Sequence, residues 1–292
     1  MNIHERIEEL SQIGRNDDGS IYRKAGTKEY YNAIKLVSDW MIADGMNTCI
    51  DEYNNLIGTI PGTDPDAKPI VVGSHIDTVP TGGKYDGVLG VLGGMEAAKR
   101  LKGTTKHPIQ VVAFYDEEDS MSGSIGFTQS KSVYDIKAFL ELHVEQGPVL
   151  DKRGADIGVV EGIVGQRRCK FVITGQANHA GTTPMDMRDD ALVKASELVS
   201  YVYHRASIYD GLVATVGKLD VSPNLFSIIP GRVDLTVQIR RNTRQQEAAI
   251  EELSELDHHF GLHKSQIAQS NLACDRKKFV SKNYQQLVFD YQ

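Results

Sequence analysis

Short apolar segments alternate with helical segments through the first half of the chain, and this alternation restricts the possible folds more than any other feature. Residues 69–74, 109–115 and 138–144 have the composition of buried strands. Residues 88–101 lie between the first two and have the pattern of a helix. The alternation predicts an α/β fold, in which helices cover both faces of a mixed sheet.

Helical and strand patterns also precede this region. Residues 3–12 and 27–44 are amphipathic at the helical period, with Thr27 suited to be an N-cap and Gly45 suited to end the second helix. Residues 49–60 have the pattern of a strand, a turn and a second strand.

The pattern changes near residue 165, where apolar and polar residues begin to alternate along the strands. We expect strands at 167–175, 212–219 and 232–240, with helices at 189–206 and 245–261. This order predicts an inserted two-layer α+β domain with one open sheet face. We therefore expect a first domain at 1–165, the inserted domain at 166–275, and a return to the first domain at 276–292.

Composition excludes several classes of protein. The net charge of −7 argues against a nucleic-acid-binding surface, and no apolar run approaches the length that spans a membrane. Cys49, Cys169 and Cys274 are too few and too widely spaced for a disulfide framework, and no secretory signal is visible at the N-terminus. We expect a cytoplasmic protein.

Polar residues that can bind metals follow the predicted strands. His75 and Asp77 end the first strand and point to the same side, so Asp77 can orient the His75 ring. A hydrogen-bonded pair without a metal is the alternative. Asp86 could bridge two cations, with Gly87 permitting a tight backbone, or could serve only as a helix N-cap.

Two further groups lie at the ends of later strands. In the acidic run 116–119, Glu118 could bind a metal and Glu117 could act as a general base, although a solvated acidic loop is the alternative. Glu141, His143 and Glu145 share one strand face. Histidine and carboxylate ligands without cysteine predict a catalytic site for zinc, manganese or cobalt.

These motifs resemble those of the N-carbamoyl-L-amino-acid hydrolase family, which includes allantoate amidohydrolases and β-ureidopropionases and is akin to dinuclear aminoacylases and metallo-carboxypeptidases. The resemblance is carried by GSHIDTVPTGGKYDGVLGV, the pair Glu117–Glu118, ELHVEQGPVLD and GQANHAGTTPMDMRDDAL. It implies a dinuclear catalytic domain, and an inserted lid domain that also forms a homodimer.

The resemblance also implies roles for individual residues. His75 and His143 would hold one metal, Glu118 would hold the other, and Asp86 would bridge them. Glu117 would be the general base and Asp77 would support His75. From the lid, His179 would stabilise the oxyanion in a partner subunit, and Arg240 would bind a substrate carboxylate. Weaker substrate-binding candidates are Gln146, Gln166, Asn178 and Ser227.

The sequence departs from the family pattern at three places. The family's second metal also takes a histidine from a C-terminal Gly-His-Asp segment, which this sequence lacks, and His258, His259 and His263 do not replace it. On this basis we expect a truncated chain with an incomplete first domain. Ser227 replaces a usual asparagine, and residues 120–122 replace a pattern that contains an arginine.

Three functions are consistent with these features. The first is a metal-dependent amidohydrolase that cleaves a C–N bond of an N-carbamoyl or ureido amino acid, with a dipeptide or N-acyl amino acid as the alternative substrate. The second is a catalytically incomplete fragment that dimerises or binds a partner. The third is a metal-free acidic cleft, which we rank last because uncompensated clustered charges are costly.

Overall fold

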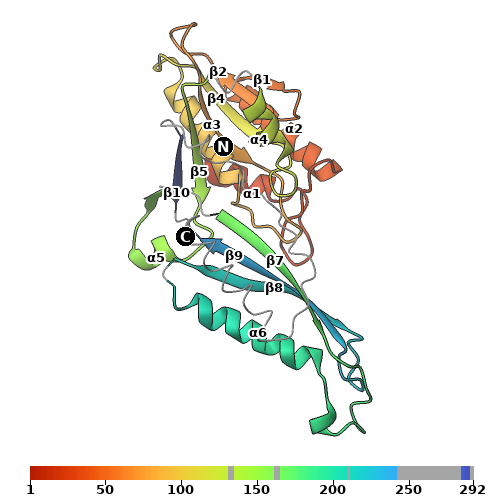
Figure 1. The fold of residues 1–292 in the computed structure, drawn as a ribbon. Helices are drawn as coiled ribbons and strands as arrows, with labels where there is room; N and C mark the ends of the chain where they lie inside the picture. The colour runs from red at the N-terminus through yellow and green to blue at the C-terminus, as the bar shows by residue number, and fades with distance from the viewer. Residues whose placement is uncertain (131–134, 161–164, 210, 242–283, 290–292) are drawn as a thin grey trace. The chain divides into compact units, whose positions relative to one another are not determined.

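The computed structural model describes residues 1–130, 135–160, 165–209, 211–241 and 284–289. The chain divides into two compact units, one of residues 1–161 and 278–292 and the other of residues 162–277. Figure 1 shows the elements of each unit. The predicted helix at 245–261 and the histidines His258, His259 and His263 lie outside the described residues.

The first unit is built on a mixed sheet. Its described strands have the order β1-β2-β4-β3-β5-β10-β6, and β4, β3, β5 and β10 run parallel to one another. The bounds are β1 Asn47–Ile50, β2 Leu56–Ile60, β3 Ile70–His75, β4 Ile109–Phe114, β5 Ala138–Val144, β6 Ile157–Val159 and β10 Tyr284–Phe289.

Helices cover both faces of this sheet, as the strand–helix alternation predicts. Alternate residues of β4 point to opposite faces, so Val111 belongs to one apolar cluster and Val112 to the other. The larger cluster contains α1, α2 and α3, and the smaller one contains Phe127 of α4. The helices are α1 Ile3–Leu10, α2 Lys28–Ala43, α3 Val88–Leu101, α4 Ser122–Gln129 and α5 Val149–Arg153.

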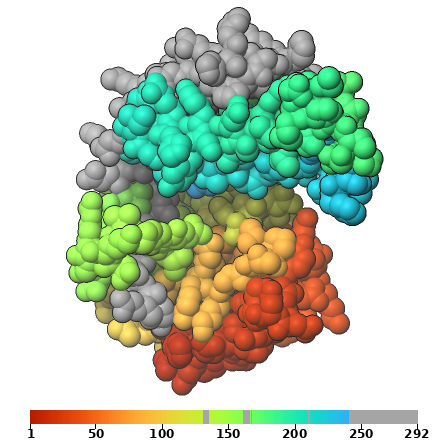
Figure 2. All heavy atoms as spheres, turned by 90° about the horizontal axis from the view of Figure 1, so that it is seen from below, coloured from red at the N-terminus to blue at the C-terminus, as the bar shows by residue number. Residues whose placement is uncertain are grey.

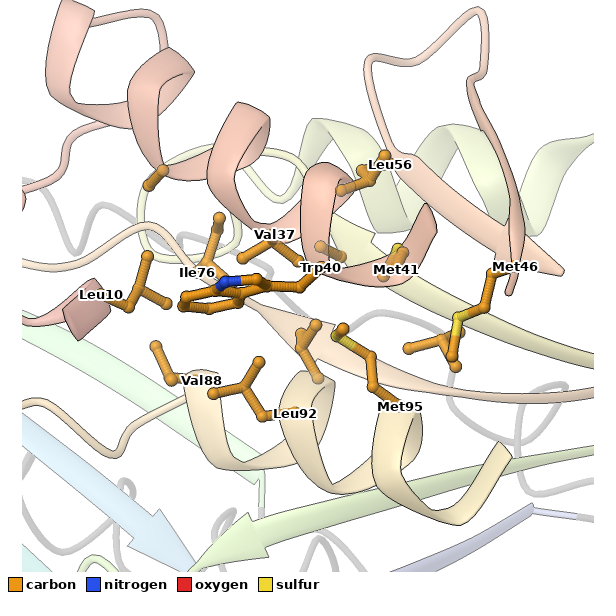
Figure 3. Close-up of a cluster of buried hydrophobic side chains, with 14 of the residues drawn as sticks. Leu10, Val37, Trp40, Met41, Met46, Leu56, Ile76, Val88, Leu92 and Met95 are labelled. Carbon is orange, nitrogen blue, oxygen red and sulfur yellow. The ribbon is translucent and has the colours of Figure 1, made fainter. Parts of the chain in front are cut away.

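The larger cluster is centred on Trp40 of α2. Figure 3 shows its ring lying between Leu10, Ile76 and Val88, so that α1, the end of β3 and α3 share one core. Ile76 is fully buried there, directly between His75 and Asp77. Packing of the core therefore constrains the backbone that carries two candidate site residues.

The second unit has two layers among its described residues. Strands β7 Gly165–Thr174, β9 Arg232–Arg241 and β8 Val213–Ser222 form an antiparallel sheet in that order. Helix α6 (Ala191–Ala206) packs on it, with Asp190 capping its N-terminus. A short 3-10 helix, η2, spans Met185–Met187. No helix that the structure describes is long and apolar enough to cross a lipid bilayer.

A buried ion pair joins α1 to the end of α2. Arg6 donates to both carboxylate oxygens of Asp44 at 2.6 and 2.9 Å, and Lys99 of α3 lies 3.1 Å from Asp44 Oδ1. Burial by itself would raise the pKa of Asp44, but the hydrogen bonds from Arg6 and Lys99 outweigh it and hold that pKa below its usual value. The pair therefore depends on an ionised Asp44.

We predict that Asp44→Asn lowers the free energy of unfolding by about 3 kcal/mol, because it leaves Arg6 buried without its counter-charge. A depressed folded-state pKa stabilises the fold fully above the usual aspartate pKa of about 3.9 and loses this contribution as pH falls through the folded value. Urea unfolding at several pH values measures both effects. Lys35→Ala, which breaks an exposed pair with Asp39, is the control. Equal small losses for both variants would contradict the prediction.

Candidate metal centre

Three adjacent strands deliver the candidate ligands to one edge of the sheet. β4, β3 and β5 are neighbours and parallel, so their carboxyl ends lie at the same edge. His75 is the last residue of β3, Glu117 and Glu118 follow β4, and His143 is the penultimate residue of β5. Ligands commonly bind at this edge in open α/β sheets.

His75 is buried, and a carbonyl group fixes its ring. Its Nδ1 lies 3.0 Å from the carbonyl oxygen of Asp77 and 3.6 Å from Asp77 Oδ1. Because a carbonyl only accepts, Nδ1 of the neutral ring carries the proton and Nε2 keeps its lone pair. Nε2 lies 3.6 Å from Glu117 Oε2, within the acidic site. His75 is therefore oriented as a metal ligand needs to be.

His143 has the same arrangement. Its Nδ1 lies 2.6 Å from the carbonyl oxygen of Val144, and its Nε2 lies 3.6 Å from Asp86 Oδ1. That carboxylate oxygen is buried, and no residue in the described part of the chain forms a hydrogen bond with it. Both imidazoles thus direct Nε2 toward carboxylates, at distances longer than a hydrogen bond.

Asp86 is not the N-cap of α3, so that alternative is wrong. Gly87 occupies the cap position with a positive φ of 66°, and no side chain caps this helix. The left-handed backbone at Gly87 turns the chain between Asp86 and the helix. Asp86 is left to face His143, and its Oδ2 accepts a hydrogen bond from Gln146 Nε2 at 2.7 Å.

The four acids of the run 116–119 have different partners. Asp116 has a positive φ of 56° and accepts from Ser120, while Asp119 lies 3.3 Å from Lys24 Nζ. The main-chain N–H of Glu118 donates to Asp77 Oδ2 at 3.1 Å. The outer two acids therefore shape the loop, and Asp77 links this loop to His75.

Crowding of like charges perturbs the site. Burial raises the pKa values of Glu117 and Glu118, and the surrounding carboxylates raise them further against the opposing charge of His75. Burial opposes protonation of His75, but Asp77 and Glu117 outweigh it and raise the pKa of His75 to about 9. A divalent cation would replace that proton as the positive partner of these carboxylates.

The residues present fit such a cation. His75, Asp86 and Glu118 each offer one ligand atom, and these atoms all lie within 4.8 Å of one another. Asp86 Oδ1 also lies 3.6 Å from Nε2 of His143, which brings this histidine next to the group. Nitrogen and oxygen donors of this kind suit zinc, manganese or cobalt.

The second unit separates its candidate residues into two groups. The main chain of Asn178 and Ala180, on either side of His179, pairs with residues 227–229, so that Asn178, His179 and Ser227 lie in adjoining loops. Gln166 and Arg240 are paired in register at the other end of the sheet. Strand rise places Arg232 and Arg240 about 27 Å apart along β9.

Comparison with known proteins identifies the family. The model for Peptidase family M20/M25/M40 matches residues 71–267. The chain belongs to this family. The matched range begins in β3 and contains His75, Asp86, Glu117, Glu118 and His143. The resemblance drawn from the motifs is thus confirmed, as is the expectation of a hydrolase.

Curated relatives within the family are named as amidohydrolases. An allantoate amidohydrolase of Bacillus subtilis is 35% identical over 94% of this chain and 74% of its own length. An N-carbamoyl-L-amino acid amidohydrolase of Geobacillus stearothermophilus is 34% identical over 82% of this chain and 68% of its own length.

A solved structure supports the same relationship. An amidase of the hydantoinase/carbamoylase family from Burkholderia multivorans superposes with a TM-score of 0.74 and 27% identity, covering 99% of this chain and 84% of that chain. The α/β fold class predicted from the sequence is confirmed by this similarity and by the mixed sheet.

We predict that Gly87→Ala damages the metal centre. A Cβ at Gly87 would lie 2.5 Å from the His75 carbonyl oxygen and 2.7 Å from two carbons of its ring, and the positive φ adds strain of about 1–3 kcal/mol. Metal content after dialysis, measured by mass spectrometry, should fall. Gly83→Ala is the control, because a Cβ there meets nothing within 4 Å. Full metal content in Gly87→Ala would contradict the prediction.

Proposed function

We propose that this chain is a metal-dependent amidohydrolase that cleaves a C–N bond of an N-carbamoyl or ureido amino acid. The observation that carries the proposal is the carboxylate of Glu117 beside the ligand group of His75, Asp86 and Glu118. The names of the amidohydrolase relatives favour this substrate class over dipeptides and N-acyl amino acids. They also favour an enzyme over a binding fragment.

The ligands would divide between two cations. His75 and His143 would hold one, Glu118 would hold the other, and Asp86 would be shared. Zinc, manganese and cobalt all suit this set. When bound, such a pair supplies an acidified water and polarises the scissile carbonyl. Gln146 donates to Asp86 through one amide N–H in this structure, so its amide oxygen could contact substrate while that bond is kept.

Glu117 is the proposed general base. Burial and neighbouring carboxylates raise its pKa, which strengthens it as a proton acceptor at neutral pH. It would take a proton from the attacking water and give it to the leaving nitrogen. Asp77 would hold His75 and the Glu118 backbone in place meanwhile, through the two contacts described above.

The lid residues are proposed to serve two different sites. His179 and Arg240 lie near opposite ends of β9, too far apart for one small substrate to contact both within a single lid. We therefore propose a homodimer in which Arg240 binds the substrate carboxylate in its own chain's site. His179 would stabilise the oxyanion in the partner's site, where Asn178 and Ser227 would also contact substrate.

We predict that Glu117→Gln lowers kcat by about 10²–10⁴-fold while metal stays bound, because the amide keeps the shape but cannot accept the proton. Hydrolysis of allantoate and of N-carbamoyl amino acids is compared with that of dipeptides, and metal content is measured on the same samples. The control is Asp119→Asn, which changes a neighbouring acid that pairs with Lys24.

The two measurements separate the remaining alternatives. Full turnover in Glu117→Gln would refute the general-base role. Two equivalents of metal per chain would contradict the incomplete-site hypothesis, whereas one equivalent or none in an inactive protein would support it. Faster cleavage of dipeptides than of carbamoyl substrates would favour the alternative substrate class.

We predict that mixing two inactive variants, His179→Ala and Glu117→Gln, restores activity. In a mixed dimer, the chain that keeps Glu117 receives an intact His179 from its partner. Random association at equal amounts makes half of the dimers mixed, each with one complete site, so about a quarter of the unchanged activity should return. Absence of any recovery, with mixed dimers shown by mass spectrometry, would place His179 in its own chain's site.

A further inference from the structure

Arg23 is a fully buried arginine beside the metal centre, and every hydrogen bond that its side chain makes to the described residues goes to a backbone carbonyl group. Its side chain is 0% exposed. Nε donates to the Ile76 carbonyl oxygen at 3.0 Å, and Nη1 donates to those of Leu10 and Ile13 at 3.3 Å each. Ile76 is the residue between His75 and Asp77, so Arg23 ties the end of α1 to the backbone that carries both.

The chain around Arg23 pairs with the loop that leads from β3 to Asp86. The Arg23 N–H donates to Thr78 Oγ1 at 2.8 Å, and Thr78 N–H donates to the Arg23 carbonyl at 3.2 Å. Ile21 and Gly82 exchange main-chain hydrogen bonds of 2.9 and 3.0 Å. Figure 2 shows the red N-terminal part of the chain directly against the orange part that contains this loop.

The charge of Arg23 also acts on the site. Burial lowers the pKa of Arg23 to about 10 against the attraction of the Asp77 carboxylate, so the guanidinium stays charged at neutral pH. Arg23 Nη2 and Asp77 Oδ1 are both buried, and neither has a hydrogen-bond partner among the described residues. The guanidinium is thus a fixed positive charge that attracts the Asp77 carboxylate.

Arg6 is a second buried arginine, and comparing its partners with those of Arg23 shows how the two residues differ. It is similarly buried, but it forms a bidentate pair with Asp44, as charge burial usually requires. Among the residues that the structure describes, no carboxylate forms a hydrogen bond or an ion pair with Arg23. No ion pair therefore offsets the free-energy cost of burying the Arg23 charge. What the side chain does instead is hold the Ile76 carbonyl, between His75 and Asp77.

We infer that Arg23 is a positioning residue for the metal centre. By donating to the Ile76 carbonyl it fixes the main chain between His75 and Asp77. This inference rests on the proposed metal site. Residues that hold metal ligands in this way commonly contribute about 10–100-fold to metal affinity.

The test measures Co²⁺ binding to the metal-free full chain. Arg23→Met should weaken binding of the first Co²⁺ equivalent by about 10–100-fold and alter the visible absorption bands of the bound ion. Arg23→Lys, which keeps the charge but not the three-carbonyl geometry, should recover part of the affinity. Arg6→Met is the control, because it should lower the urea midpoint while leaving Co²⁺ affinity and bands unchanged.

The outcomes are distinguishable. The inference is overturned, and the proposed function is left intact, if Arg23→Met binds Co²⁺ with the same affinity and the same absorption bands as the unchanged chain. No Co²⁺ binding by the unchanged chain would overturn both. If Arg23→Met does not fold, Arg23→Lys and Thr78→Val decide the matter: weakened Co²⁺ binding in both supports the inference, and unchanged binding in both refutes it.

Discussion

The parallel arrangement of β4, β3 and β5 determines where the chemistry of the first unit can occur. Because these strands end together, the sheet brings two histidines and several carboxylates to one edge. Burial, and then the neighbouring carboxylates, raise the pKa values of Glu117 and Glu118, and attraction to the same carboxylates raises the pKa of His75. A site of this composition is electrostatically suited to a divalent cation, and poorly suited to remaining without positive charge.

Strand ends alone do not give a ligand geometry, and the loops that follow them need separate support. Each loop is supported by different residues. A hydrogen bond between Ser120 and Asp116 shapes the acidic loop, and Gly87 turns the chain after Asp86. Arg23 holds the Ile76 carbonyl in the loop after β3. Asp77 joins two of these loops, because it contacts the His75 ring and the Glu118 N–H. The positive φ of Asp116 places backbone strain beside the candidate ligands, as functional sites often do, whereas Gly87 adopts its positive φ without strain.

The sequence allowed the regular elements to be predicted because their periodicity is strong. The helix at 88–101 and the strand at 138–144 have the predicted bounds, and Thr27 caps α2 as expected. Helix α4 was missed, because its glycine-rich segment has little amphipathic pattern. The burial of Arg23 could not be predicted either. Arginine is normally exposed, and its three carbonyl partners come from segments that only the tertiary fold brings together.

For the candidate residues beyond residue 165, separation along the sequence does not predict distance in the fold. Ser227 and Arg240 are 13 positions apart in one chain segment, yet β9 carries them toward opposite ends of the same sheet. A motif comparison treats them as parts of one substrate site. The strand between them keeps these residues far apart within one copy of the unit, and this separation is the observation on which the proposed homodimer depends.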